Sequence, residues 1–191
     1  MNTAKFEEEL QIHTRIIEQT VRECSQTLGE ITGCLVDCFR KGGKIMLCGN
    51  GGSAADSQHI AAEFVNRYRM ERPALPAIAL TVDTSILTAI GNDSSNEFTF
   101  SRQVEALGRP GDILAALSTS GASPNILKVL EVARARGLRT IGFTGETGRQ
   151  TMAPKCDLCL VVPSSETPRV QEVHEFVWHV ICGMVEQALF T

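Results

Sequence analysis

The sequence has no excess of positive charge and no long apolar run. Lys and Arg number 18 against 22 Asp and Glu, so the net charge is −4. This balance gives no electrostatic reason to expect a nucleic acid or an anionic membrane surface as a partner. No apolar run approaches the roughly 20 residues that span a bilayer, and the acidic start lacks the apolar core of a secretion signal. We therefore expect a cytoplasmic protein with neither a membrane nor a nucleic-acid partner.

Metal-binding or redox pairs of cysteines are also scarce. The seven cysteines are odd in number and mostly sit among apolar residues, which indicates buried thiols in a reducing compartment. Cys156 and Cys159 have the spacing of a metal or redox pair, but no second pair accompanies them and an apolar run follows. We interpret them as thiols on and beside a strand.

The length of 191 residues and the 43% apolar content suit one α/β domain with an additional helical element. Residues 1–41 are expected to be helical, because apolar residues recur every three, four or seven positions in two stripes. Gly42 and Gly43 should end the second of two helices there. These helices precede the sheet, so a bundle shared between subunits is one way to bury their stripes.

From residue 42 to 191, short apolar segments alternate with helical patterns, which predicts a parallel sheet covered on both faces. Strands are expected at 45–48, 77–81, 113–117, 140–144 and 158–162, and helices near 53–68, 97–107, 123–136 and 168–189. In such sheets ligands bind beyond the carboxyl ends of the strands, near the point where the strand order reverses. The loops that follow the strands are therefore the places to look for chemistry.

The first notable loop, Gly49-Asn50-Gly51-Gly52-Ser53, follows the first strand. Its glycines would let the backbone turn sharply and approach a ligand closely. The loop lacks both G-x-G-x-x-G and the lysine of a Walker loop, so it predicts no dinucleotide or triphosphate site. On its own, the pattern fits a ligand loop and a tight turn equally well.

The second loop, Ser118-Thr119-Ser120-Gly121-Ala122-Ser123, follows the third strand and precedes a helix that begins at Pro124. The N-terminus of that helix offers free amides and a positive dipole, which together bind anions. A helix cap needs one hydroxyl, whereas this loop has four, which favours phosphate binding over simple capping. The absence of Lys and Arg makes a small phosphorylated ligand a better fit than a nucleoside triphosphate.

Candidate acids, bases and metal ligands lie on two helices. His59 and Glu63 are four residues apart and share a helix face, which is typical of a metal pair and also of an ordinary surface pair. Gln171 and His179 are eight apart on the last helix, roughly 12 Å along its axis and about 80° apart in direction. Asp93 lies in a polar loop, where its pattern is equally consistent with a third ionisable group of the site and with an ordinary loop cap.

Taken together, these motifs resemble the phosphoheptose isomerases, a family with the SIS fold. The resemblance rests on the two loops above, on Gly91-Asn92-Asp93 and on Arg169-Val170-Gln171-Glu172-Val173-His174, and it extends over nearly the whole chain. It implies one SIS domain over residues 1–191, with a five-stranded parallel sheet flanked by helices and an N-terminal helical extension. It also implies a homotetramer with active sites at subunit interfaces.

The resemblance further implies that the protein converts sedoheptulose 7-phosphate to D-glycero-D-manno-heptose 7-phosphate in bacterial heptose synthesis for surface polysaccharide such as lipopolysaccharide. It implies one zinc ion per subunit, held by His59, Glu63, Gln171 and His179. The positions that match the family's substrate-binding residues are Asn50, Gly51, Gly52, Asn92, Asp93, Ser118, Thr119, Ser120, Ser123 and Gln171. Pro168 is a departure, because some members have an aspartate there.

For the aldose–ketose reaction, which passes through an enediol, we expect Glu63 to act as the base and His179 as the partner acid. Two alternatives remain at this stage. One is a non-catalytic binding protein of the DnaA initiator-associating type, which keeps a similar cleft. The other is an isomerase of another ketose phosphate.

Overall fold

The sheet determines how the rest of the chain is arranged. The computed structural model describes residues 3–191. Five parallel strands lie in the order β2-β1-β3-β4-β5. Their bounds are β1 Ile45–Gly49, β2 Ala77–Ala79, β3 Ile113–Ser118, β4 Arg139–Gly145 and β5 Leu158–Val162. The predicted five-stranded parallel sheet is thus confirmed, and its order reverses between β1 and β3, which are neighbours.

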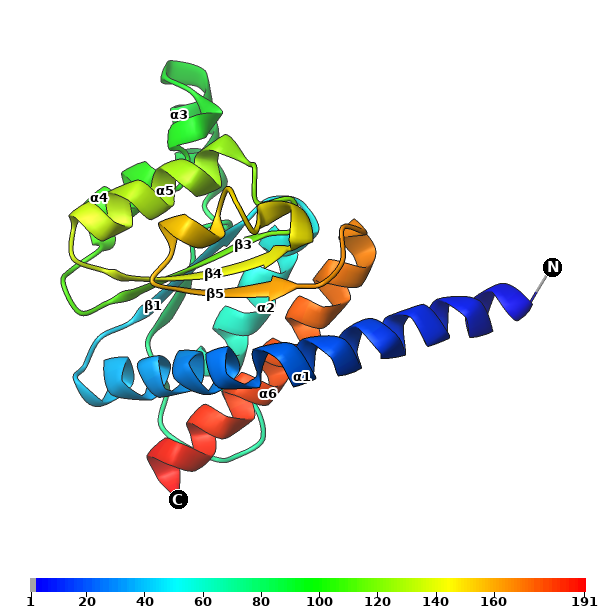
Figure 1. Ribbon diagram of the computed structural model, residues 1–191. Coiled ribbons are helices and arrows are strands. Elements are labelled where there is room, and N and C mark those ends of the chain that lie inside the picture. Colours follow the sequence, from blue (N-terminus) through cyan, green and yellow to red (C-terminus); the bar gives the residue numbers. More distant parts are fainter. Residues whose placement is uncertain (1–2) are drawn as a thin grey trace.

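Helices cover both faces of the sheet, as Figure 1 shows. One face packs against α1 (Ala4–Arg40), α2 (Gly52–Val65) and α6 (Thr167–Phe190). The other face packs against α4 (Ser101–Leu107) and α5 (Pro124–Ala135). Alternate residues of β1 and β3 enter the two cores, so these strands are buried on both sides. This is why their sequences are continuously apolar.

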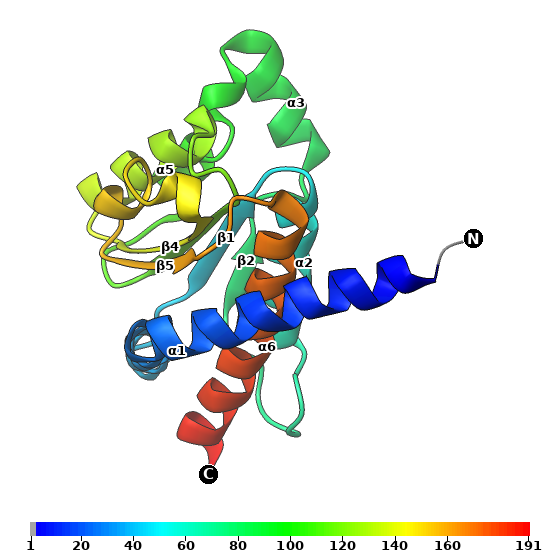
Figure 2. The ribbon, with the colours of Figure 1, turned by 45° about the vertical axis from the view of Figure 1, so that its right-hand side comes forward.

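The N-terminal region is one helix of 37 residues, not the two helices that we predicted. Its C-terminal half buries Ile31 and Leu35 in the core. A glycine such as Gly29 lowers the stability of an isolated helix by about 1 kcal/mol relative to alanine. The packing on either side of Gly29 nevertheless keeps the helix continuous. The N-terminal half extends past the body as an arm, which buries Ile16 and Thr20 but leaves Phe6 and Leu10 80% and 62% exposed (Figures 1 and 2).

Helix α3 (Thr84–Asp93) was not predicted, because we expected a polar loop around Asp93. The side chain of Asp83 accepts a hydrogen bond from the Ile86 amide at 2.9 Å and so caps the helix. Every residue of α3 keeps part of its surface exposed, so α3 contributes no fully buried residue to either core. Helix α4 begins at Ser101 rather than Glu97, because a 3-10 turn at Asn96–Phe98 precedes it.

Aromatic rings join the helices of the first face to the sheet. Trp178 of α6 stacks on Phe143 of β4 with ring centroids 4.6 Å apart, and Phe64 of α2 meets Trp178 edge-on at 6.4 Å. Phe39 of α1 lies 5.3 Å from Phe64. Beside this cluster, His174 is fully buried with its ring edge-on to Phe143.

No helix within residues 3–191 is long and apolar enough to cross a membrane.

The burial of His174 predicts that stability depends on pH. Burial lowers the pKa of this side chain from 6.5 to about 4. Between these two pKa values the unfolded chain binds a proton that the folded chain does not. The free energy of unfolding should therefore fall as the pH falls from about 6.5 to 4, by a few kcal/mol from this residue.

Denaturant unfolding at several pH values between 4 and 7 measures this dependence. The variant His174→Gln should lose that part of the pH slope. An unchanged slope in the variant would show that another group is responsible.

Candidate active site

The loops after β1 and β3 lie side by side because the two strands are paired, with Gly49 opposite Leu117. Gly51 has a φ of 56° and a ψ of −121°, a conformation that favours glycine. A side chain on Gly52 would collide with the amide of Gln171, which lies directly against this loop. The glycines therefore allow α6 to approach the loop closely, which supports a ligand loop over a plain turn.

The loop after β3 surrounds a small cavity of about 90 Å³. It is lined by Asn50, Ser53, Leu117, Ser118, Thr119, Ser120 and Ser123. The Ser118 hydroxyl accepts a hydrogen bond from the Gly121 amide at 3.1 Å, which closes the turn. Gly121 has a φ of 64° and packs tightly on Gly148. All of the predicted phosphate-binding hydroxyls thus converge on one hollow.

Ser123 is the N-cap residue of α5 and Pro124 its first helical residue, as the sequence predicted. Its hydroxyl, however, faces that of Ser118 at 3.4 Å instead of bonding to the helix. The hydroxyl is therefore directed toward the cavity, where an anion would meet it together with the positive end of the helix dipole. Asn50 is held by two amide hydrogen bonds of 2.9 Å to Asn125 of α5.

A second, larger cavity of about 630 Å³ opens between α2 and α6, with α1 at its rim. It is lined by His13, Ile17, Ala55, Asp56, His59, Pro168, Gln171, Glu172, Glu175, Phe176 and His179. The sequence predicted three of these as site residues: His59, Gln171 and His179. Glu63 lies one turn beyond His59 and contacts it.

The two histidines and two carboxylates form a contiguous cluster. The Nε2 atom of His59 lies 3.1 Å from Oε1 of Glu63, and its Nδ1 atom lies 2.5 Å from Oε1 of Glu175. His179 Nε2 is 3.8 Å from the same oxygen of Glu175. The rings of His59 and His179 meet edge-on at 5.0 Å, and Tyr68 stacks on His179 at 5.5 Å. Donor atoms of His59, Glu175 and His179 all lie within 4.8 Å of one another, which is close enough to hold one metal ion.

The sequence reasoning missed Glu175. It lies four residues after Gln171 and four before His179, so all three are on neighbouring turns of one helix face. That spacing was available from the sequence, but a glutamate on an exposed helix face is common and carries no signal of its own. Only its position opposite His59, on another helix, makes it part of the cluster.

Asp56 was also missed. Its Oδ1 atom accepts a hydrogen bond from Nε2 of Gln171 at 3.2 Å, and this bond fixes the orientation of the Gln171 amide. Burial raises the pKa of Asp56 to about 6, and the hydrogen bond from Gln171 offsets part of that rise. Gln171 thus lies between the glycine loop on one side and a buried carboxyl on the other.

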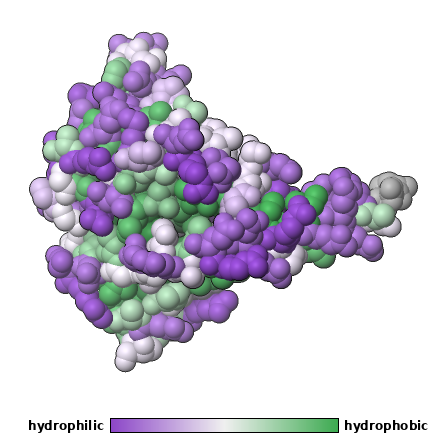
Figure 3. Space-filling view, viewed as in Figure 1, coloured by the Kyte–Doolittle hydropathy of each residue, from purple (hydrophilic) through white to green (hydrophobic). Residues whose placement is uncertain are grey.

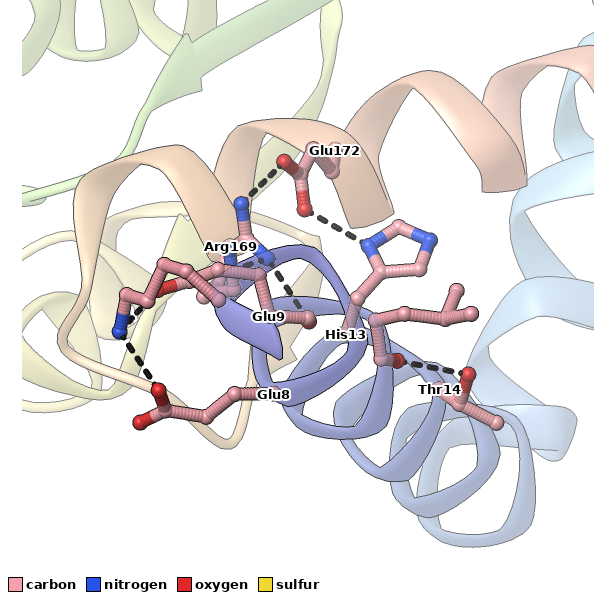
Figure 4. A network of polar contacts seen from close by, with 8 residues as sticks. Glu8, Glu9, His13, Thr14, Arg169 and Glu172 are labelled. Atoms are coloured by element: carbon pink, nitrogen blue, oxygen red, sulfur yellow. Dashed lines mark hydrogen bonds and ion pairs between the residues drawn. The ribbon is translucent and has the colours of Figure 1, made fainter. Parts of the chain in front are cut away.

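A polar network on α1 and α6 closes the rim of the larger cavity, and Figure 4 shows it. Nδ1 of His13 lies 2.6 Å from Glu172, whose other oxygen is 2.5 Å from the Arg169 guanidinium. Arg169 also donates to the backbone oxygen of Glu9 at 3.2 Å, which attaches α1 to the first turns of α6. Pro168 lines the cavity beside this network.

Asn92 and Asp93 are not brought to either cavity. They lie at the C-terminal end of α3, where Nδ2 of Asn92 donates to Oδ1 of Asp93 at 2.7 Å. Asp93 lines a separate hollow with Arg102 and Glu105. Their role in substrate binding stays a prediction.

Comparisons with known proteins agree with this geometry. The sequence model of the SIS domain matches residues 10–145. A phosphoheptose isomerase from Roseiflexus sp. (strain RS-1) is 53% identical over 183 residues, which cover 96% of this chain and 92% of that relative. The phosphoheptose isomerase of Rhodospirillum rubrum is 54% identical over 87% of this chain and 88% of its own. The chain belongs to the phosphoheptose isomerase family.

A solved phosphoheptose isomerase from Neisseria gonorrhoeae superimposes with a TM-score of 0.90 at 37% identity, over 96% of this chain and 98% of its own. One from Francisella tularensis gives 0.91 at 34% identity, over 98% and 100% of the two chains. The SIS fold inferred from the motifs is confirmed. The relatives favour the isomerase over the binding-protein alternative. Both are phosphoheptose isomerases by name, and this chain matches them over most of their length.

The small cavity leads to a testable prediction about the binding of a sugar phosphate by this phosphoheptose isomerase. Replacing Ser120 by Ala should weaken the binding of a sugar phosphate by about 1–3 kcal/mol, the usual value of a hydrogen bond to a charged group. Calorimetric titration of wild-type and variant protein with sedoheptulose 7-phosphate measures the difference.

Ser25→Ala is a suitable control, because Ser25 is exposed on α1. It should bind like the wild-type protein. Equal affinity in Ser120→Ala and Ser25→Ala would place the phosphate elsewhere.

Proposed function

We propose that this chain interconverts sedoheptulose 7-phosphate and D-glycero-D-manno-heptose 7-phosphate, as the names of its relatives imply. One observation carries the proposal: Gln171, which lines the larger cavity together with His59 and His179, has its amide against Gly52 of the loop beside the small cavity. A phosphate anchored by Ser118, Thr119, Ser120 and Ser123 would thereby direct its sugar toward α2 and α6.

The anchor uses neutral donors rather than cations. Hydroxyl groups, loop amides and the N-terminus of α5 can each donate to a phosphate oxygen. Asn50, Gly51 and Gly52 lie beside it on the neighbouring loop, and Asn92 and Asp93 are proposed to complete the substrate contacts from a neighbouring subunit. A dephosphorylated sugar should accordingly be a poor substrate.

The reaction moves one proton from C1 to C2 and redistributes the hydroxyl protons. A base removes the C1 proton of the ketose while an acid protonates the O2 carbonyl oxygen, which gives the enediol. Loss of the O1 proton and return of a proton to C2 then give the aldose. We assign the carbon-acid step to Glu63 and the oxygen proton to His179. Both belong to the cluster in the structure.

The cluster also suits a metal ion. The predicted ligands His59, Glu63, Gln171 and His179 offer only nitrogen and oxygen donors, a set that zinc accepts. The structure adds the nearby carboxylate of Glu175. One zinc ion per subunit, when bound, would polarise the substrate carbonyl.

The variant Glu63→Gln tests the assignment of the base. It keeps the shape of the side chain but removes its basicity, so turnover should fall by ~10²–10⁴-fold. NMR observation of the aldose formed from sedoheptulose 7-phosphate measures this rate. Fructose 6-phosphate and ribulose 5-phosphate tested alongside decide whether the seven-carbon sugar is required.

Glu71→Gln serves as the matched control, because the Glu71 side chain is 86% exposed just beyond α2. This variant should retain the wild-type rate. If Glu63→Gln turns over at a similar rate, the base is another group.

We further propose that the protein works as a homotetramer in the cytoplasm, where its free thiols stay reduced. Apolar side chains are exposed along the arm of α1, at Phe6, Leu10 and Val21, and on α6, at Phe176, Val180 and Met184. The surface view shows hydrophobic patches on the arm and on the body beside it (Figure 3). Such surfaces are typical of subunit interfaces.

Replacing Leu10 by Asp should weaken this assembly. Its side chain is 62% exposed, so the monomer loses little packing, whereas a charge at an apolar interface is costly. Light scattering with size-exclusion chromatography should show a shift from tetramer to smaller species. Lys5→Asp changes the charge nearby without affecting an apolar position and should leave the tetramer intact.

A further inference from the structure

The segment between α2 and β2, residues 66–76, contains no helix or strand, yet a buried carboxylate holds part of its backbone in place. The side chain of Glu186 on α6 is only 1% exposed. Its Oε1 atom accepts a hydrogen bond from the Tyr68 amide at 2.8 Å. Its Oε2 atom accepts from the amides of Arg69 and Met70 at 2.9 and 3.2 Å. Three consecutive amides of the segment are thus attached to one side chain of α6.

Arg72 connects the same carboxylate to α2. Its side chain is also 1% exposed, and its Nε atom donates to Glu186 at 3.0 Å. The other guanidinium nitrogens donate to the backbone oxygens of Phe64 and Glu63, each at 2.8 Å. A buried ion pair is weak evidence for stability, because the desolvation of both charges offsets their attraction. Its clear effect here is geometric: it ties the end of α2, which carries Glu63, to α6, which carries His179.

Tyr68 lies where this anchored segment meets His179. The Tyr68 ring stacks on the imidazole with centroids 5.5 Å apart and an angle of 18° between the planes. The His59 ring meets the same imidazole edge-on at 5.0 Å, so two rings restrict the orientation of His179. Glu186 follows His179 on α6 by seven residues, or roughly two turns. The carboxylate that holds the Tyr68 backbone therefore belongs to the same helix as the histidine on which the Tyr68 ring stacks.

We propose that Tyr68 is a positioning residue for the isomerase reaction. Its ring, held in place through Glu186 and Arg72, keeps the imidazole of His179 in the orientation from which it transfers a proton to the substrate oxygen. The inference deepens the proposed function and rests on it. Tyr68 acts through His179, which lines the larger cavity, and takes no part in the proton transfers itself.

Two substitutions separate the ring from the rest of the side chain. Tyr68→Leu removes the stacking surface and leaves the acid misplaced, so kcat for sedoheptulose 7-phosphate should fall by ~10–100-fold. Because substrate binding is not the step affected, KM should stay within about twofold of the wild-type value. Tyr68→Phe keeps the ring and should recover most of the rate. Glu71→Gln changes an 86% exposed side chain of the same segment and should behave like the wild-type protein.

Histidine NMR supplies a reading that needs no turnover. The chain has four histidines, so protein labelled with ¹³C-histidine gives few imidazole signals, and His179→Gln identifies the one from His179. A ring stacked on an imidazole shifts the resonances of its protons. Tyr68→Leu should therefore move the His179 signal, while Tyr68→Phe and Glu71→Gln should leave it near its wild-type position. The signal of His174, which is buried in the core, should stay unchanged in all three and serves as the check on folding.

Several results would overturn the inference. They are a wild-type kcat in Tyr68→Leu, a loss that appears in KM alone, a Tyr68→Phe variant as slow as Tyr68→Leu, and a His179 signal that Tyr68→Leu does not move. A displaced His174 signal in Tyr68→Leu would also overturn it, because Tyr68 would then support the fold as a whole. If the wild-type protein converts no heptose phosphate, the NMR result decides alone. A His179 signal moved by Tyr68→Leu and not by Tyr68→Phe would then leave the positioning of His179 standing while the proposed function fails.

Discussion

The pairing of β1 with β3 is the constraint on which the site depends. Gly49 lies opposite Leu117, so the residues that follow, Asn50 and Ser118, line one cavity at this edge of the sheet. Because β2 lies on the far side of β1, no other strand separates the two loops. Backbone hydrogen bonds between two buried strands thus fix the position of the small cavity, and the two loops need only supply polar side chains around it.

The second requirement is the close approach of α6 to that edge of the sheet. The aromatic packing of Trp178 on Phe143 and Phe64 fixes the middle of α6, and Gly52 leaves room for the amide of Gln171 at its N-terminal part. The face of α6 that looks toward α2 then carries Gln171, Glu175 and His179 to His59 and Glu63. Several carboxyl groups meet here in a partly buried space. Such a concentration of like charge is stable only with protons, histidines or a metal ion to balance it.

Much of this could be predicted from the sequence, because the relevant signals are local. Continuous apolar runs marked all five strands, and the serine-rich turn before Pro124 marked the small cavity that we propose to bind phosphate. The long helix was predicted as two because periodicity reveals stripes but not whether a helix passes through Gly29. We missed helix α3 because its C-terminal residues, Gly91-Asn92-Asp93, were interpreted as part of a polar loop. Glu175 and Asp56 escaped detection because each gains its role only from a residue on another helix.

The network of His13, Glu172, Arg169 and Glu9 gives the N-terminal arm a second significance. His13 lines the larger cavity and is also part of the attachment of α1 to α6. The arm is therefore a wall of the pocket as well as the surface that we propose for subunit contacts. Removing the first two dozen residues would also remove His13 and Ile17 from the lining of the larger cavity.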